Sequence, residues 1–281
     1  MTYEAVVSLD IDSTQYVHYD ASEDSASYVL KHTLESLKDA GKILVVHNTG
    51  RPYPWACHGE QIERYLKPII ADPNYLISHA GTVIWDSELK NPSEVWRNTI
   101  LEICPPDAVQ DLIRTLDREG YKFDPETFGN EFKVCIKTSP EEHPAAVASI
   151  KALITEKYPF FDVAYWNNTS VDITPRGINK STALDFLRAQ EGLVHLPVIT
   201  GGDSMNDAPL LTNPSYLKIL VGNALPELKA MTSNLPNIFQ AQASHKAAAG
   251  VLAGLIHYGV VSEHHVSEVR ASLGLQQPTF I

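Results

Sequence analysis

Two carboxylates one residue apart, Asp10 and Asp12, follow the first apolar run of the chain, residues 5–9. Two charges at the end of a buried strand are unfavourable, because each repels the other and each loses water, unless a cation lies between them. One such carboxylate can bind a metal ion and attack phosphorus while the other acts as an acid beside the leaving group. Asp, Ser and Thr are also common in turns, so the segment alone fits an ordinary turn equally well.

A second acidic cluster, Gly202-Asp203-Ser204-Met205-Asn206-Asp207, follows another apolar run far along the chain. Asp203 and Asp207 are four residues apart and would share a helix face if a helix began at Ser204. Capping of a helix also explains one Asp, but it requires neither the second Asp nor the two preceding glycines. Oxygen ligands without His or Cys favour Mg²⁺ over zinc, so the two clusters together predict a magnesium site.

Two further segments offer groups that can hold a phosphate. Thr49-Gly50-Arg51 follows the second apolar run, and Thr49 can donate its hydroxyl and its backbone N–H to a phosphate oxygen, although a plain loop explains the segment too. Lys180 opens a predicted helix, where its charge opposes the helix dipole, and this mismatch favours a functional role. Lys180-Ser181-Thr182 is similar to the end of a P-loop, but no glycine-rich loop follows a strand here, which argues against a nucleoside triphosphatase.

The elements that position these residues alternate between strand and helix. Strands are predicted at 4–9, 42–47 and 75–78, with helices at 25–40 and 55–66 between them. The same pattern resumes near the C-terminus, with helices at 180–190, 206–211, 244–258 and from 261, and strands at 196–200, 217–221 and 237–241. Such alternation predicts a Rossmann-like parallel sheet, whose strands all end at the edge where ligands bind.

The segment between these two parts has a different pattern. A β-hairpin is predicted around 86–88, helices at 92–103, 106–119 and 143–157, and strands at 131–138, 161–166 and 170–174. This is an α+β pattern. We therefore predict an inserted domain at 86–173 and a core made of 1–85 and 174–281.

Composition narrows the class of protein. The chain has 281 residues, of which 44% are hydrophobic and 20% charged, as is usual for a soluble globular protein. No apolar run reaches membrane-spanning length, and the first residues lack the pattern of a signal peptide, so we expect a cytoplasmic protein without a membrane partner. The net charge of −12 argues against nonspecific nucleic-acid binding, although a metal and local cations still allow an anionic substrate.

Cysteine and histidine usage gives no sign of a disulfide framework or a zinc site. The three cysteines, Cys57, Cys104 and Cys135, are odd in number and are not spaced as metal ligands, so we expect reduced thiols. Eleven histidines occur, but no His-Glu-x-x-His or Cys-x-x-Cys pattern does. Mg²⁺ is therefore the one cofactor that we predict.

In their order along the chain these motifs resemble those of the haloacid-dehalogenase (HAD) superfamily of aspartate-nucleophile phosphatases. Asp10-Ile11-Asp12-Ser13-Thr14 matches its first motif, Thr49 the second, Lys180 the third and Gly202 to Asp207 the fourth. The insertion is similar to that superfamily's type-2 (C2B) cap. The resemblance implies a HAD fold whose core binds the metal and whose cap determines substrate specificity.

The same resemblance implies a role for each motif residue. Asp10 is expected to be the nucleophile and a Mg²⁺ ligand, and Asp12 the general acid and base, with its backbone carbonyl on the metal. Asp203 is expected to bind Mg²⁺ directly, and Asp207 directly or through water. The remaining residues are expected to hold the phosphoryl group or to orient the loops around it: Thr49, Gly50, Lys180, Ser204 and Asn206.

Within the superfamily the chain most resembles the sucrose-phosphate phosphatases and the Cof-type sugar phosphatases. Segments such as Ala80-Gly81-Thr82, Phe132-Lys133-Val134 and Val171-Asp172-Ile173-Thr174-Pro175 have counterparts in the first group. The chain departs from that group at Val83, where an acidic residue is usual, and at Thr169-Ser170, where a Lys-Asp-like pair is usual. These departures lie where the sugar is expected to bind.

We therefore predict a Mg²⁺-dependent phosphatase that hydrolyses a sugar phosphate monoester similar to sucrose 6-phosphate through an aspartyl-phosphate. Amide groups, cations and aromatic rings suit sugar binding, and plain cap structure is the alternative explanation for most of the candidates, which are Arg51, His79, Lys133, Trp166, Asn167 and Asn168. A sugar phosphomutase or phosphotransferase and a non-catalytic sugar-phosphate-binding module are alternative functions. The identity of the sugar and the choice between monomer and homodimer stay open.

Overall fold

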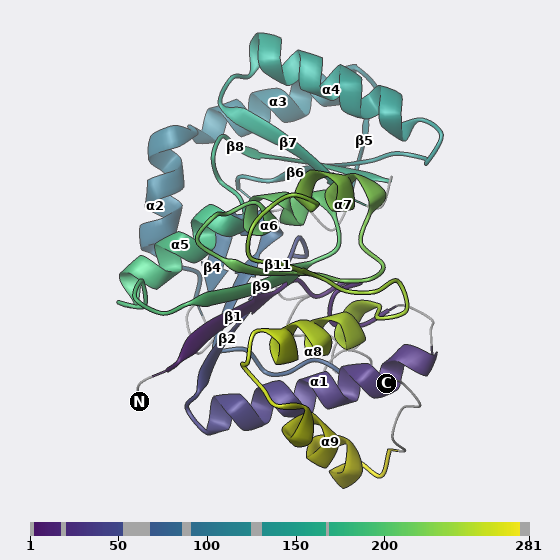
Figure 1. Cartoon of the computed structure of the whole chain (residues 1–281). Helices are drawn as coiled ribbons and strands as arrows, with labels where there is room; N and C mark the ends of the chain where they lie inside the picture. The colour runs from purple at the N-terminus through teal and green to yellow at the C-terminus, as the bar shows by residue number, and fades with distance from the viewer. Residues whose placement is uncertain are drawn as a thin grey trace.

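The computed structural model describes residues 3–17, 21–52, 68–85, 91–124, 131–166 and 169–275. Their strands form two sheets, one of seven strands and one of four. In Figure 1 the smaller sheet and its two helices lie above the larger sheet and its helices. The predicted fold class, a parallel α/β core with an inserted α+β part, is confirmed.

The larger sheet has the strand order β11-β10-β9-β1-β2-β3-β4. All neighbouring strands are parallel except β3 and β4, which are antiparallel. The sheet lies between helices, so its central strands are buried on both faces and read as continuous apolar runs. The strand bounds are β1 Ala5–Leu9, β2 Ile43–Asn48, β3 Tyr75–Ser78, β4 Val83–Trp85, β9 Val198–Gly202, β10 Leu217–Leu220 and β11 Ile238–Gln240.

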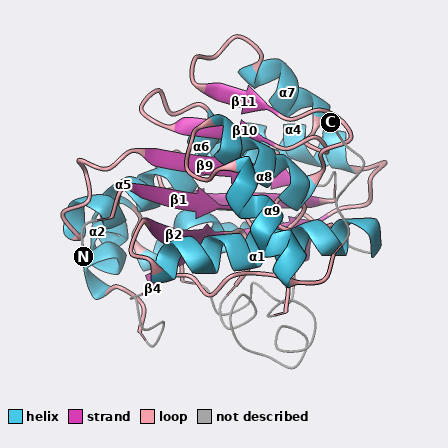
Figure 2. Ribbon diagram, turned by 60° about the horizontal axis from the view of Figure 1, so that its bottom comes forward, coloured by secondary structure: helices cyan, strands magenta, loops and turns pink. Residues whose placement is uncertain are grey.

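Helices cover both faces of this sheet. On one face, which is in front in Figure 2, lie α1 (Ala21–Asp39), α8 (Ala247–His257) and α9 (Glu263–Ser272), and α7 (Pro226–Thr232) adds Leu228 to the same hydrophobic cluster. On the other face lie α5 (Lys180–Gln190), α6 (Ala208–Leu211) and α2 (Glu94–Ile103). These two clusters hold the sheet between them, which fixes the relative positions of the strand ends.

The smaller sheet has the order β5-β6-β8-β7 and is antiparallel throughout. Its bounds are β5 Lys122–Phe123, β6 Val134–Lys137, β7 Phe161–Trp166 and β8 Ser170–Pro175. Helices α3 (Pro106–Arg118) and α4 (His143–Lys157) pack on it and share a third hydrophobic cluster. Trp96 and Ile100 of α2 pack instead in a cluster of the large sheet, and the predicted domain boundaries stay a prediction.

Some details differ from the sequence prediction, and others fall outside the described residues. The turn of the hairpin expected around 86–88 falls outside the described residues, although Trp85 on one side of it forms an antiparallel bridge with Pro92 on the other. On its other edge β4 pairs with β3, after a tight turn at His79–Gly81. The short elements β5 and α7 were not predicted, because neither is long enough to show a clear periodicity. The helix expected at 55–66 also lies outside the described residues.

Two expectations from composition concern the described residues directly. Cys104 and Cys135 are buried free thiols, as predicted, and Cys57 lies outside the described residues. Among the helices that the structure describes, none has the length and apolar character needed to cross a bilayer.

Candidate active site

Three of the predicted site residues follow adjacent strands at one edge of the large sheet. Asp10 follows β1, Thr49 follows β2 and Asp203 follows β9. Because β1 is parallel to both of its neighbours, the carboxyl ends of all three strands point the same way. The backbone N–H of Asp10 donates to Gly201 O at 3.1 Å, which ties the loop after β1 to β9.

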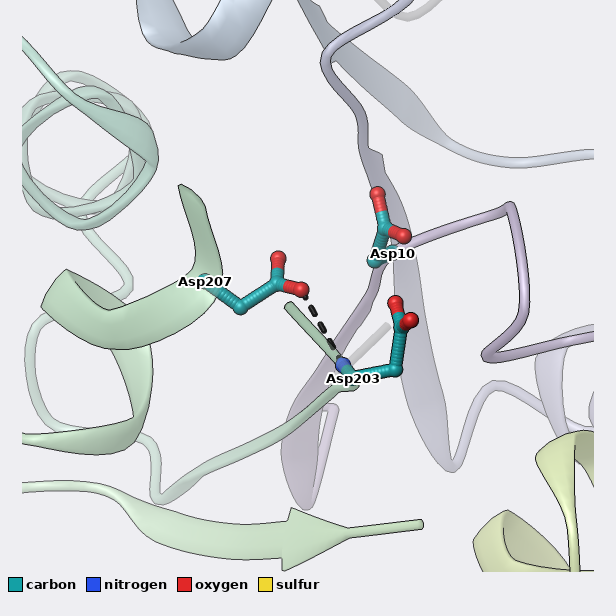
Figure 3. Close-up of side chains that lie close together, drawn as sticks. All are labelled: Asp10, Asp203 and Asp207. Atoms are coloured by element: carbon teal, nitrogen blue, oxygen red, sulfur yellow. Dashed lines mark hydrogen bonds between the residues drawn. The ribbon is translucent and has the colours of Figure 1, made fainter. Parts of the chain in front are cut away.

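Asp10, Asp203 and Asp207 form a buried carboxylate cluster at this edge. One oxygen from each residue lies within 4.8 Å of the other two, a spacing that could hold a metal ion. Figure 3 shows the three side chains converging from β1 and from the turn after β9. The carboxylate of Asp12 does not belong to this cluster, and the proposed coordination by its backbone carbonyl stays a prediction.

Lys180 joins two of these carboxylates. Its Nζ lies 2.7 Å from Asp10 Oδ1 and 2.6 Å from Asp207 Oδ1, and its side chain is fully buried. Burial alone would lower the pKa of Lys180, but the charges and hydrogen bonds of the two carboxylates raise it overall. Asn179 caps the N-terminus of α5, so the helix begins at Lys180. The charge that opposes the helix dipole is thus compensated by two carboxylates, and its predicted role in binding phosphoryl oxygens stays a prediction.

Asp207 reaches the cluster in a way that the sequence did not predict. It lies in a short 3₁₀ turn, and its Oδ2 accepts backbone N–H groups from Asp203 at 3.1 Å and Ser204 at 3.2 Å. The two Asp residues therefore meet through this capping interaction and not on one face of a helix. A Cβ at Gly202 would lie 2.5 Å from the Asp207 side chain, so the turn requires glycine there.

The cluster carries more negative than positive charge. Burial raises the pKa of Asp10 to about 7, since it outweighs the opposing charge of Lys180, and Asp207 and Asp12 raise it further. Burial and the neighbouring carboxylates also raise the pKa of Asp203 well above its usual value. An oxygen-only donor set with an excess of negative charge fits a hard divalent cation such as Mg²⁺.

Asp12 lies beside the cluster in a separate polar network. Arg51 donates from Nε and Nη2 to the two carboxylate oxygens of Asp12, and the Tyr16 hydroxyl donates to Asp12 Oδ1 at 2.6 Å. Arg51 Nη2 also donates to the Tyr16 hydroxyl at 2.9 Å. Arg51 was predicted to bind substrate. Here its guanidinium positions Asp12, and contact with substrate stays a prediction.

At Thr49 the backbone N–H is already hydrogen-bonded within the sheet, whereas the Thr49 hydroxyl and the Gly50 N–H can still donate. The N–H of Thr49 donates to Ile77 O at 2.9 Å, within the sheet, so the prediction that it donates to phosphate is wrong. The Thr49 hydroxyl accepts from the N–H of Arg51 at 3.1 Å, which leaves its own proton to donate. Within the described part of the chain no acceptor takes the Gly50 N–H.

Ser204 and Asn206 were predicted to orient the loop, and both side chains lie within it. The Ser204 hydroxyl donates to Asn206 Oδ1 at 2.9 Å. A Cβ at Gly50 would lie 3.2 Å from Asn206 Nδ2, so this amide packs against the backbone of the second motif. The amide thereby joins the loop after β2 to the loop after β9.

Sequence reasoning missed several residues that contact Asp10 or Asp203, or lie beside those contacts. The Thr14 hydroxyl donates to Asp203 Oδ1 at 3.4 Å. Gln15 Nε2 donates to Asp10 O at 3.0 Å and lies 3.1 Å from His47 Nδ1. His47 Nε2 lies 2.7 Å from the carbonyl of Ala71, and burial lowers the pKa of this imidazole to about 4. Position was the available signal, since Thr14 and Gln15 lie within three residues of Asp12.

The sugar-binding candidates are only partly described. Lys133 is buried between the sheets, where its Nζ lies 3.0 Å from Asp172 Oδ1 and donates to Gly50 O at 2.9 Å. His79 is 8% exposed and lies in the tight turn after β3. Trp166 ends β7, and Asn167 and Asn168 lie outside the described residues. The roles of all five stay predictions.

Comparison with known proteins identifies the family to which this chain belongs. A family model described as sucrose-6F-phosphate phosphohydrolase matches residues 3–259. The chain is 23% identical to a mannosylfructose-phosphate phosphatase from Agrobacterium fabrum, over 91% of this chain and 97% of that protein. It is 24% identical to sucrose-phosphatase 1 from Nicotiana tabacum, over 89% of this chain but 58% of the tobacco protein.

Solved structures show the same fold. A sucrose-phosphatase from Synechocystis, solved in complex with sucrose and phosphate, superposes with a TM-score of 0.75. It is 21% identical to this chain, and the match covers 92% of this chain and 99% of that structure. Identity at this level shows the fold alone.

Proposed function

The chain belongs to the sucrose-6F-phosphate phosphohydrolase family, and from that premise we propose that it is a Mg²⁺-dependent phosphatase acting on a phosphorylated sugar. Membership of this family confirms the predicted class, a phosphoric monoester hydrolase of sugar phosphates. One observation carries the assignment of the active site. Asp10 lies at the end of β1 between Lys180 and Asp203, at the carboxyl edge of the parallel sheet.

Asp10 is the nucleophile in this proposal. One of its carboxylate oxygens forms a bond to phosphorus while the ester P–O bond to the sugar breaks. Asp12 enters this step as the neutral carboxylic acid and gives its proton to the departing sugar oxygen. It then takes a proton from a water molecule, whose oxygen bonds to phosphorus as the bond to Asp10 breaks, so that inorganic phosphate and the free enzyme result.

The other motif residues stabilise charge or hold geometry. Lys180 and the hydroxyl of Thr49 bind phosphoryl oxygens, and the N–H of Gly50 adds a backbone donor. Asp10 and Asp203 are the proposed direct Mg²⁺ ligands. Asp207 has both oxygens engaged by protein donors, so it orients Asp203 and Lys180. When bound, the ion offsets negative charge on the phosphoryl group.

The substrate is proposed from the relatives and from the position of the second sheet. Two relatives are named as a mannosylfructose-phosphate phosphatase and a sucrose-phosphatase, and the substrates in both names are phosphorylated disaccharides. We propose a substrate of this class, whose sugar part is bound by residues of the cap such as Lys133. A cytoplasmic location is part of the same proposal.

A substrate panel tests the proposal. Phosphate release is measured with sucrose 6-phosphate, mannosylfructose phosphate, glucose 6-phosphate and fructose 6-phosphate, each with Mg²⁺ and with EDTA. We expect Mg²⁺-dependent release that is fastest on a disaccharide, and its loss in Asp10→Asn with the fold retained by circular dichroism. No release from any of these substrates, or full release by Asp10→Asn, would contradict the proposal.

A further inference from the structure

His79 lies beside the active site and has a structural setting that the proposed chemistry does not use. It follows β3, and its backbone N–H donates to Arg51 O at 2.9 Å. The next residue, Ala80, donates its N–H to Thr49 O at 3.0 Å. His79 is therefore attached directly to the loop that carries the second motif.

The backbone of this turn is strained and tightly held. His79 and Ala80 have φ values of 53° and 58°, in the left-handed region that is unfavourable for residues with a Cβ. A Cβ at Gly81 would lie 2.3 Å from the backbone of Asn179, the residue that caps α5. Unfavourable backbone angles persist only where the surroundings fix them, so the direction of the imidazole is set by the fold.

The hydrogen bonds around Ser78 define the tautomer of His79. Trp85 Nε1, which can only donate, donates to Ser78 Oγ at 3.1 Å. Ser78 Oγ lies 3.0 Å from His79 Nδ1 and is buried. Among the described residues Nδ1 is the one acceptor within reach of the Ser78 proton, so Nδ1 accepts and the neutral ring carries its proton on Nε2.

The Nε2–H group is left as a donor at the boundary between the two sheets. His79 is 8% exposed, and within the described segments no group is hydrogen-bonded to Nε2. Burial, and then the positive charge of Lys133, lower the pKa of His79 to about 3, which keeps the ring neutral. Lys133 donates to Gly50 O, so it contacts the same loop as His79 from the other sheet.

We propose that His79 donates its Nε2–H to an oxygen of the sugar part of the substrate and is thus a specificity-determining residue of this chain. The inference rests on the proposed phosphatase function. The group that it selects is a hydroxyl or ether oxygen near the phosphate ester. A phosphoryl oxygen is the other acceptor of the same chemistry, and the test separates the two.

Kinetics with two kinds of substrate make that separation. The panel sugar phosphate that is hydrolysed fastest is compared with 4-nitrophenyl phosphate, which has a phosphate but no sugar oxygen. Loss of one neutral hydrogen bond corresponds to about tenfold in affinity. For His79→Ala we expect KM for the sugar phosphate to rise about tenfold with kcat little changed, and kcat/KM for the aryl phosphate to fall much less.

The controls use the same turn. Ala80→Gly keeps the imidazole and relieves the unfavourable φ of residue 80, so it should leave kcat and KM for both substrates unchanged. His79→Gln offers an amide N–H in place of the imidazole, and it should recover part of the lost affinity. An equal loss on both substrates in His79→Ala would assign the donor to the phosphoryl group and overturn the proposal. A wild-type protein inactive on every sugar phosphate would overturn the proposed function itself.

The tautomer is tested separately, in the wild-type protein, by long-range ¹H–¹⁵N correlation of the histidine side chains at pH 7. We expect the His79 signals of a neutral ring with Nδ1 as acceptor and a proton on Nε2, assigned by their absence in His79→Gln. Ser78→Ala should convert this single form into a mixture of tautomers. A charged ring, or a proton on Nδ1 in the wild type, would overturn the assignment even if the enzyme is active.

Discussion

Replacing Asp10, the proposed nucleophile, should make the metal-free protein more stable. Asp10, Asp203 and Asp207 are buried together with one cation, Lys180, so removing one negative charge relieves repulsion. Burial is the largest cause that raises the pKa of Asp10, from 3.8 to about 7. The amide oxygen of Asp10→Asn can still accept the hydrogen bond from Lys180, so the substitution removes charge with little loss of contact.

The raised pKa of Asp10 determines both how much Asp10→Asn changes the free energy of unfolding and how that change depends on pH. A rise of this size corresponds to at most about 4 kcal/mol in the free energy of unfolding, or up to about 8 °C in Tm for a chain of this length. Between about pH 4 and pH 7 the folded protein binds the Asp10 proton and the unfolded chain does not. The wild type therefore loses stability as pH rises through this window, and Asp10→Asn does not.

Thermal unfolding in EDTA checks this at two pH values. The free energy of unfolding of Asp10→Asn should exceed that of the wild type by about 3 kcal/mol more at pH 8 than at pH 5. Mg²⁺ should reduce this difference, because it stabilises the wild type. Asp12→Asn is the matched control. It leaves Arg51 without its carboxylate and should destabilise by about 1–3 kcal/mol. A lower Tm for Asp10→Asn in EDTA at pH 8, or an advantage independent of pH, would refute the reasoning.

Three further substitutions test the network around the cluster. Lys180→Met leaves buried carboxylates without a cation, so the free energy of unfolding should fall by about 3–5 kcal/mol in urea titrations with EDTA; an unchanged midpoint would contradict this. Tyr16→Phe removes a hydrogen bond to Asp12, so steady-state assays should show kcat about tenfold lower at constant KM, whereas a change in KM alone would indicate a substrate contact. Gly202→Ala forces a Cβ against Asp207, so stability should fall by about 1–3 kcal/mol and half-maximal activity should need more Mg²⁺; activation at the wild-type Mg²⁺ concentration would argue against that role.

The position of the reactive groups could be predicted because each belongs to the end of an element. Asp10, Thr49 and Asp203 follow apolar runs that become neighbouring parallel strands, and Lys180 starts a helix capped by Asn179. The hydrophobic pattern sets the strand boundaries, and parallel pairing then brings the ends together. Local sequence was therefore enough to place these side chains at one edge.

Side-chain pairing could not be predicted in the same way. Arg51 binds Asp12 and Gln15 contacts His47, because the loops bring together residues that lie 39 and 32 positions apart in the sequence. No periodicity encodes which rotamer a loop residue takes. The partner of each polar group therefore follows from the path of the loop and not from the spacing of the motif.

Charge distinguishes the two buried ionic sites of the described structure. Lys133 and Asp172 are both buried, 3.0 Å apart, and their charges cancel, so this pair needs no further ion. At the edge of the large sheet, the positive charge of Lys180 offsets one of the three negative charges of Asp10, Asp203 and Asp207. A divalent cation would offset the other two. A cation should therefore bind in the core, while the paired charges of Lys133 and Asp172 leave that part of the boundary suited to the uncharged oxygens of a sugar.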